Sequence, residues 1–257
     1  MFDDSAAFEV VNPAGRRPVL ILCDHASRHV PAELDNLGLE ESQLRRHIGW
    51  DIGAADVSRR LAGLMDAPAV LSGVSRLVID CNRPPDSPAS IPAESDGVPV
   101  PGNGGLGEAE RQRRIERFFR PYHCEIERRL AEFAARGIVP AVISLHSFTP
   151  VMNGFQRPWH VGLLWDRDGR MALPLIASLG RDPSLIVGDN QPYSGREPRG
   201  FALHTYGEGR GLPMAVFELR QDLIDTHHGA EAWAYRLAAA LRPVLDDPAL
   251  YRMRPPG

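Results

Sequence analysis

Short apolar runs alternate with amphipathic segments along the chain. Residues 19–23 are apolar throughout and follow Pro18, a pattern typical of a strand buried on both faces. In the run 139–145, Pro140 favours pairing of the later part only. Further short apolar runs predict strands at 69–71, 77–79, 160–164, 185–187 and 214–219.

Apolar residues at helical spacing lie between these runs. They predict a helix over 52–65 and a long Arg- and Glu-rich helix over 109–135, which Gly137 ends. Two more helices are predicted at 171–179 and 230–245. Strands that alternate with helices favour an α/β fold, here a three-layer sandwich on a mixed, mostly parallel sheet. Because we find no repeat and no linker, we expect a single domain over 1–257.

The segment 83–107 differs from the rest of the chain. It lacks periodicity, and six of its residues are proline. A loop of this length within a compact domain is usually functional or disordered. Its composition fits an active-site lid and a passive surface loop equally well.

Polar side chains follow four of the predicted strands. In open α/β sheets the ligand crevice lies beyond the carboxyl ends of the strands, so side chains at these ends should meet in space. The four strand ends carry Asp24-His25-Ala26-Ser27, Asp80-Cys81-Asn82-Arg83, His146-Ser147 and Glu218-Leu219-Arg220.

Composition narrows the possible functions. The 257 residues carry a net charge of −4, which gives no reason to expect a nucleic acid or an anionic membrane as partner. The sequence contains no lysine, which excludes Schiff-base, pyridoxal-phosphate and P-loop chemistry in this chain. The three cysteines form no CxxC pair, and residues 1–11 lack a signal-peptide pattern. We therefore expect a cytoplasmic location.

Histidines and carboxylates at strand ends are a ligand set that suits zinc. Catalytic zinc takes three protein ligands and leaves one position open for water. Taken alone, His25 or His146 is more often a hydrogen-bonded structural histidine. Because both directly follow apolar runs, the pair favours a functional site.

Several motifs together resemble the N-formylglutamate amidohydrolase family. They are His25-Ala26-Ser27, Trp50-Asp51-Ile52-Gly53, Ser75-Arg76 followed by Asp80-Cys81-Asn82-Arg83-Pro84, Leu145-His146-Ser147, and Glu218-Leu219-Arg220-Gln221-Asp222. The resemblance covers about residues 19–224. It implies a phosphorylase/hydrolase-like α/β fold related to the zinc carboxypeptidases, and a zinc-dependent amidase that releases formate and glutamate from N-formyl-L-glutamate. The segments 24–27 and 191–200 depart from the family pattern, so the resemblance supports amide hydrolysis more firmly than this substrate.

For the metal we expect His25 and His146, with Asp51 as the third ligand because the family's Asp-Trp-type segment falls there. The alternative for Asp51 is a helix N-cap, since a predicted helix begins at the next residue. The other candidates for the third ligand are Asp24, Asp80 and, more weakly, His47. Asp24 and Asp80 could instead orient a ligating imidazole through its other nitrogen.

Glu218 is the expected general base. A buried carboxylate beside a metal can take the proton of the attacking water and pass it to the leaving amine. The alternative is a structural glutamate paired with Arg220 or Arg199.

A substrate carboxylate calls for arginine, whose guanidinium donates two hydrogen bonds in one plane. Arg83 with Asn82 is the first choice, followed by Arg76 and Arg199. Ser27 and Ser147 lie beside the proposed ligands, outside any Gly-x-Ser-x-Gly elbow, and are expected to hydrogen-bond a ligand or the scissile group.

The sequence thus predicts a metal-dependent hydrolase that cleaves a small N-formyl or N-acyl amino acid, with Zn²⁺ or another divalent metal as cofactor. The alternatives are a zinc carboxypeptidase, a peptidoglycan-type amidase, or a non-catalytic ligand-binding relative.

Overall fold

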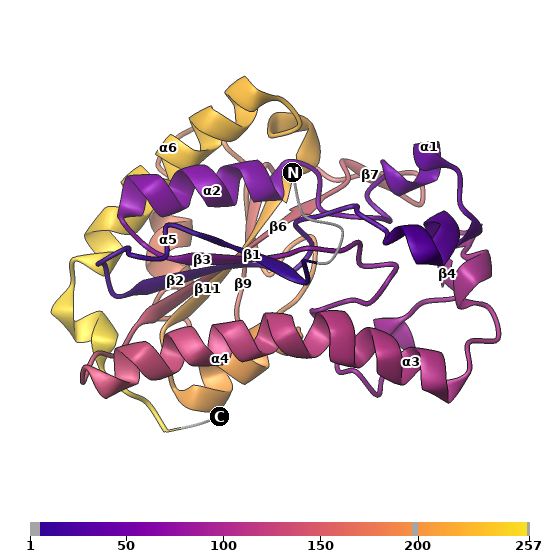
Figure 1. Ribbon diagram of the computed structural model, residues 1–257. Helices are drawn as coiled ribbons and strands as arrows, with labels where there is room; N and C mark the ends of the chain where they lie inside the picture. Colours follow the sequence, from indigo (N-terminus) through magenta and orange to yellow (C-terminus); the bar gives the residue numbers. More distant parts are fainter. Residues whose placement is uncertain (1–5, 197–199, 256–257) are drawn as a thin grey trace.

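The computed structural model describes residues 6–196 and 200–255 and is built on a seven-stranded sheet (Figure 1). The strand order is β1-β3-β2-β6-β11-β9-β10. These strands are β1 (Phe8–Val11), β2 (Val19–Cys23), β3 (Ala69–Ser72), β6 (Ala141–Phe148), β9 (Val161–Leu164), β10 (Val187–Asp189) and β11 (Met214–Arg220).

The sheet is mixed and mostly parallel, which confirms the prediction. Strands β3, β2, β6 and β11 run parallel to one another. At one edge β1 pairs antiparallel with β3, and toward the other edge β9 pairs antiparallel with β11 and parallel with β10. The four central parallel strands therefore end at the same edge of the sheet.

Helices cover both faces of this sheet, so the layers are those of an α/β sandwich (Figure 1). Helices α2 (Ala54–Met65), α5 (Ala172–Leu179) and α6 (His227–Leu245) share one core cluster with Val19, Ile21 and Cys23 of β2. On the other face α4 (Arg120–Ala135) packs with Leu20 and Leu22. This alternation explains why β2 is apolar at every position.

The predicted strand at 77–79 is wrong. These residues are buried but form a turn, because local hydrogen bonds take the place of a ladder. The Ser75 carbonyl accepts from the amide of Val78, and the Ser75 hydroxyl oxygen accepts from the amide of Leu77. Burial without periodicity could not separate a turn inside the core from a strand.

Several predicted boundaries shift. Helix α2 begins at Ala54, after Gly53 in a left-handed conformation (φ 80°), where an added Cβ would lie 2.1 Å from the carbonyl oxygen of Ile224. Helix α6 begins at His227, after Thr226 as its N-cap, instead of at residue 230. The strand predicted at 185–187 is β10, which covers Val187–Asp189. The predicted helix 109–135 is α3 (Glu108–Arg114), a π-helical turn η4 (Ile115–Phe119) and α4.

The proline-rich segment 83–107 contains only short elements, and hydrogen bonds fix it to the core. Asn103 donates to the carbonyls of Leu77 (2.8 Å) and Pro92 (2.9 Å), and Arg114 donates to Asn103 Oδ1 (2.7 Å). The short elements here are η2 (Pro88–Ser90), β4 (Glu94–Ser95), β5 (Val98–Pro99) and η3 (Pro101–Asn103).

The remaining short elements lie outside the sheet and the main helices: η1 (Ala32–Gly38), α1 (Glu41–Leu44), β7 (Val151–Met152), β8 (Phe155–Gln156), η5 (Leu203–Gly207), η6 (Glu208–Arg210), η7 (Gln221–Leu223) and η8 (Pro248–Tyr251). Within residues 6–196 and 200–255, the helices are all too short or too polar to cross a lipid bilayer.

Candidate active site

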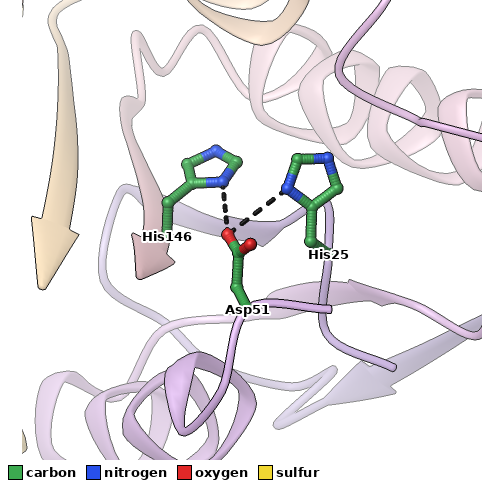
Figure 2. A group of neighbouring side chains, drawn as sticks. All are labelled: His25, Asp51 and His146. Carbon is green, nitrogen blue, oxygen red and sulfur yellow. Dashed lines mark hydrogen bonds and ion pairs between the residues drawn. The ribbon is translucent and has the colours of Figure 1, made fainter. Parts of the chain in front are cut away.

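His25, Asp51 and His146 meet at the carboxyl ends of the parallel strands (Figure 2). The Asp51 carboxylate oxygen Oδ2 lies 2.8 Å from Nδ1 of His146 and 3.3 Å from Nδ1 of His25. All three side chains are buried, and one ligand atom of each lies within 4.8 Å of the others. Such a group could hold a metal ion.

The backbone brings these three residues together from separate elements. His25 follows β2 by two residues, and its carbonyl accepts from the amide of Asp51 (2.9 Å). His146 lies within β6, and the next amide, that of Ser147, donates to Asp51 Oδ2 (3.3 Å). The N-cap of α2 is Gly53, so the Asp51 carboxylate does not cap that helix and points at the two imidazoles.

Each imidazole meets a second carboxylate through its other nitrogen. His25 Nε2 lies 2.7 Å from Asp80 Oδ1, and His146 Nε2 lies 3.3 Å from Asp24 Oδ2 and 3.1 Å from the Ser144 hydroxyl. An imidazole whose Nε2–H donates to a carboxylate presents a free Nδ1 lone pair. This holds for His25 through Asp80, whereas the hydrogen bond of His146 Nε2 is with the Ser144 hydroxyl. The Nδ1 atoms of both rings face the centre of the cluster.

The charge balance of the cluster also suits a cation. Burial opposes ionisation of Asp51, but its contacts with His25 and His146 outweigh burial and hold its pKa well below the ordinary value. Burial lowers the pKa of His146, but its contacts with Asp24 and Asp51 outweigh burial and raise this pKa well above the ordinary value. In the protein alone, protons on the imidazoles therefore neutralise the carboxylates. A divalent ion held by Nδ1 of His25, Nδ1 of His146 and Oδ2 of Asp51 would supply the same positive charge. This donor set therefore fits the expected metal.

Glu218 lies in β11 directly opposite His146 of β6 in the parallel register. Its Oε2 is buried and has no hydrogen-bond partner among the described residues. Burial is the main reason that the pKa of this carboxyl rises to about 7. The alternative pairing with Arg220 is not formed, because the Arg220 side chain donates to Asp222 (2.8 Å). Arg199 lies outside the described residues.

A cavity of about 510 Å³ opens above this cluster, and its walls include the three grouped residues, Glu218, Arg76, Asn82, Arg83 and Ser147. In the described parts of the chain, the Arg83 guanidinium bonds only the carbonyl of Asn82 (3.4 Å), so it can accept an anion. Arg76 is held by Asp80 (2.8 Å), and Asn82 Oδ1 accepts from the amide of Ala202 (3.0 Å).

The remaining predicted site residues make contacts outside the group formed by His25, Asp51 and His146. The Ser147 hydroxyl donates to the carbonyl of Ile52 (2.9 Å) beside the cluster. The Ser27 hydroxyl accepts from the amide of His29 (3.0 Å), so it stabilises a turn. His47 is apart from the three grouped residues, with Nε2 3.4 Å from an Asp96 oxygen.

Sequence reasoning missed three residues that support or line the site. Tyr122 of α4 donates to Asp24 Oδ1 (2.7 Å), but its amphipathic spacing suggested only core packing. Ser144 lies two residues before His146 in β6, so strand periodicity could have found it. Tyr193 forms part of the cavity wall and falls in a segment without a periodic signal.

A buried imidazole and carboxylate cluster that could hold a metal ion, with Glu218 and an open cavity beside it, is an arrangement suited to a hydrolase. Comparison with known proteins agrees with this class. The sequence profile of the N-formylglutamate amidohydrolase family matches residues 17–225, and the chain belongs to this family. It is accordingly a hydrolase of carbon–nitrogen bonds with amidohydrolase activity.

Two solved structures share the fold. The gene product Atu2144 from Agrobacterium tumefaciens is 36% identical with a TM-score of 0.91, over 94% of this chain and 96% of that one. The N-formylglutamate amidohydrolase from Ralstonia eutropha JMP134 is 20% identical with a TM-score of 0.64, over 92% of this chain and 98% of that one. No curated protein matches the chain.

Proposed function

We propose that this protein hydrolyses the amide bond of a small N-formyl or N-acyl amino acid, similar to N-formyl-L-glutamate, with Zn²⁺ or another divalent metal as cofactor. One observation carries the proposal. Two imidazole Nδ1 atoms converge on Asp51 while both Nε2 atoms face carboxylates. Glu218, whose Oε2 has no hydrogen-bond partner in the described parts of the chain, lies opposite His146. The cavity of about 510 Å³ has the size of a small-molecule site, which favours this substrate class over a peptide.

His25, His146 and Asp51 are the proposed ligands, and Asp80 and Asp24 orient the two rings. The bound ion would activate a water molecule and polarise the substrate carbonyl. In this chain the proton is handled by Glu218, which takes it from the attacking water and returns it to the leaving amine. In the ion-free protein, burial raises the pKa of Glu218 to about 7, so this carboxyl is more basic than an exposed one.

Arg83 is the proposed partner of the substrate carboxylate, because its guanidinium lines the cavity and lacks an acidic partner among the described residues. Arg76 stays charged, because neighbouring Asp80 and Asp51 outweigh burial and raise its pKa. It would add a second cation to the cavity wall. Asn82 would present its amide beside His146. Arg199 remains a predicted substrate-binding residue.

A cytoplasmic location is part of the proposal. Cys23, Cys81 and Cys124 are all free thiols, and Cys23 and Cys81 are buried. Unpaired cysteines are typical of a reducing compartment.

The experiment combines metal analysis with a substrate panel. Purified protein is expected to carry about one zinc per chain, to hydrolyse at least one N-formyl or N-acyl amino acid, and to lose this activity with a chelator. Re-addition of zinc should restore it. Undiminished turnover by protein shown to be metal-free would contradict the metal mechanism, and a zinc-loaded protein that cleaves no member of the panel would contradict the proposed substrate class.

A further inference from the structure

Arg157, directly after β8, is a buried arginine with 9% of its surface exposed. In the described parts of the chain, the contacts of its guanidinium do not include a carboxylate. Its Nη1 donates to the Tyr193 hydroxyl (3.1 Å) and to the carbonyl of Thr149 (3.4 Å). Its Cζ lies 5.0 Å from the centre of the Tyr193 ring and 5.8 Å from that of Phe148. Because burying an unpaired charge is costly, these contacts have to account for the position of Arg157.

The contact with Arg157 leaves the Tyr193 hydroxyl able to donate. A phenol hydroxyl has one proton and two lone pairs, and the guanidinium occupies one of the lone pairs. Among the described residues, none accepts a hydrogen bond from this hydroxyl. Tyr193 lines the cavity of about 510 Å³ together with Arg83 and Glu218. The proton of the hydroxyl is therefore available to an oxygen atom of a bound ligand.

The charges around Tyr193 keep this proton in place and polarise it. Burial raises the pKa of the phenol and the Glu218 carboxylate raises it further, whereas the Arg157 guanidinium opposes the rise. The net effect is a pKa above the ordinary value, so the hydroxyl stays protonated near neutral pH. Because the charges of Glu218 and Asp51 act on the phenol, it lies within electrostatic range of the proposed base and of a proposed metal ligand.

The segment that carries Tyr193 is fixed against the sheet. Asn190 Oδ1 accepts from the amide of Gly195 (2.9 Å), which closes the turn that contains Tyr193. At Gly162 of β9, an added Cβ would lie 1.7 Å from the carbonyl oxygen of Gln191, so the segment packs directly on the strand. Tyr193 is 41% exposed, yet the turn holds its backbone and the buried guanidinium holds its hydroxyl.

We propose that the Tyr193 hydroxyl donates a hydrogen bond to an anionic oxygen of the substrate, and that Arg157 is the positioning residue that orients this hydroxyl. The inference rests on the proposed function and adds a substrate-binding residue from the segment 191–200, which departs from the family pattern. The anionic oxygen is either that of the substrate carboxylate or the amide oxygen, which gains charge when water attacks. Both favour a polarised O–H donor.

The first test replaces Tyr193 by Phe in the zinc-loaded protein, which removes the hydroxyl and keeps the ring. The substrate is the N-formyl or N-acyl amino acid that the wild type cleaves fastest. We expect kcat/KM to fall about 10- to 100-fold, because the lost hydrogen bond is to a charged group. Tyr235→Phe, at an exposed position of α6, is the matched control and should leave kcat/KM unchanged. A Tyr193→Phe protein with the kcat/KM of the control overturns the inference.

The kinetic pattern identifies the oxygen. If the partner is the substrate carboxylate, the loss appears mainly in KM. The amino-acid product keeps that carboxylate, so its dissociation constant, measured by calorimetry, should rise in Tyr193→Phe by a similar factor. If the partner is the amide oxygen, kcat falls and the dissociation constant of the product stays the same. Either pattern supports the inference.

The second test replaces Arg157 by Met, which removes the guanidinium and keeps an apolar side chain beside the two rings. We expect kcat/KM to fall about tenfold when Tyr193 is present and by less than about twofold when Tyr193→Phe is already in place, because both changes remove the same contact. Arg117→Met is the matched control, since it removes a guanidinium that lies over the Phe118 ring (4.9 Å) away from the cavity walls. Equal losses in the two backgrounds contradict the positioning role.

The outcomes separate this inference from the proposed function. A wild-type protein that cleaves the substrate while Tyr193→Phe cleaves it equally well leaves the proposed function standing, and the inference fails. A zinc-loaded wild-type protein that cleaves no N-formyl or N-acyl amino acid contradicts the proposed function, and the inference then fails with it.

Discussion

His25 and His146 are each engaged at both ring nitrogens. The inner nitrogens face Asp51, and the outer nitrogens face Asp80 and Asp24. Two groups can be removed one at a time to test this arrangement. Removing the Glu218 carboxylate should affect proton transfer, and removing the Asp80 carboxylate should affect the affinity for the metal.

Replacing Glu218 by Gln removes the proposed base and keeps the shape of the side chain. We expect kcat to fall by roughly 10²- to 10⁴-fold, because an amide cannot accept the water's proton. Zinc content should stay the same, since Glu218 is not a proposed ligand. The control is Glu116→Gln, an exposed glutamate that pairs with Arg120 on the helix surface. A Glu218→Gln enzyme with near wild-type kcat would remove this residue from the mechanism.

Replacing Asp80 by Asn weakens the hydrogen bond that orients His25. Loss of such a carboxylate typically lowers metal affinity by about 10- to 100-fold. The dissociation constant for zinc can be measured by competition with a chelating dye. Asp96→Asn is the matched control, because Asp96 also lies beside a histidine, His47, away from the cluster. An affinity equal to that of the control would show that Asp80 does not support the site.

At the scale of elements, two contacts organise the site. The parallel register of β6 and β11 places His146 opposite Glu218. On the α4 face, Tyr122 donates to Asp24, and the next residue, His123, lies between the carbonyl of Cys81 (3.1 Å) and the Tyr206 hydroxyl. Helix α4 thus ties the Asp80–Arg83 turn to η5, whose Leu203 lines the cavity.

The His123 environment predicts a pH dependence of stability. Burial lowers the pKa of this imidazole to about 4, against an ordinary value of about 6.5. Above pH 6.5 the ring is neutral in both states. As pH falls from 6.5 to 4, only the unfolded chain binds the proton, so the free energy of unfolding should drop by roughly 3 kcal/mol from this group.

Urea unfolding between pH 7.5 and 4.5 measures this effect. Since other groups titrate in the same range, the informative quantity is the difference between wild type and His123→Gln. The variant should lose less stability than the wild type as pH falls. Parallel pH profiles for the two proteins would mean that His123 titrates normally in the folded state.

At the scale of the whole molecule, the site joins segments that are far apart in the sequence, from His25 to Glu218. An ion held by His25, Asp51 and His146 would join the end of β2, the residues before α2, and β6. An ion that binds only the folded protein should therefore stabilise the entire domain.

We expect zinc at 100 times its dissociation constant to stabilise the protein by about 2.7 kcal/mol. For a chain of this size the shift corresponds to a rise in Tm of roughly 5–10 °C. Scanning calorimetry with zinc and with chelator measures it. His146→Ala should show no zinc-dependent shift, and a shift that persists in this variant would place the stabilising ion elsewhere.

Sequence alone determined much of the fold and the family of the protein. The apolar run at 19–23 and the helical spacing at 52–65 and 109–135 are set by local burial, and the structure contains the corresponding elements. The family followed from motifs that are contiguous in sequence, such as Asp80 to Arg83. The metal, base and substrate roles of individual residues stay predictions.

Only the tertiary structure decided how these segments meet. Periodicity reports burial but not the partner, so the buried run 77–79 was expected as a strand and is a turn. Gly53, two residues after Asp51, has a left-handed backbone, and the carbonyl of Ile224 leaves no space for a Cβ, so only glycine fits there. The ring nitrogen that each histidine turns inward depends on contacts between residues distant in the sequence, which no local pattern specifies.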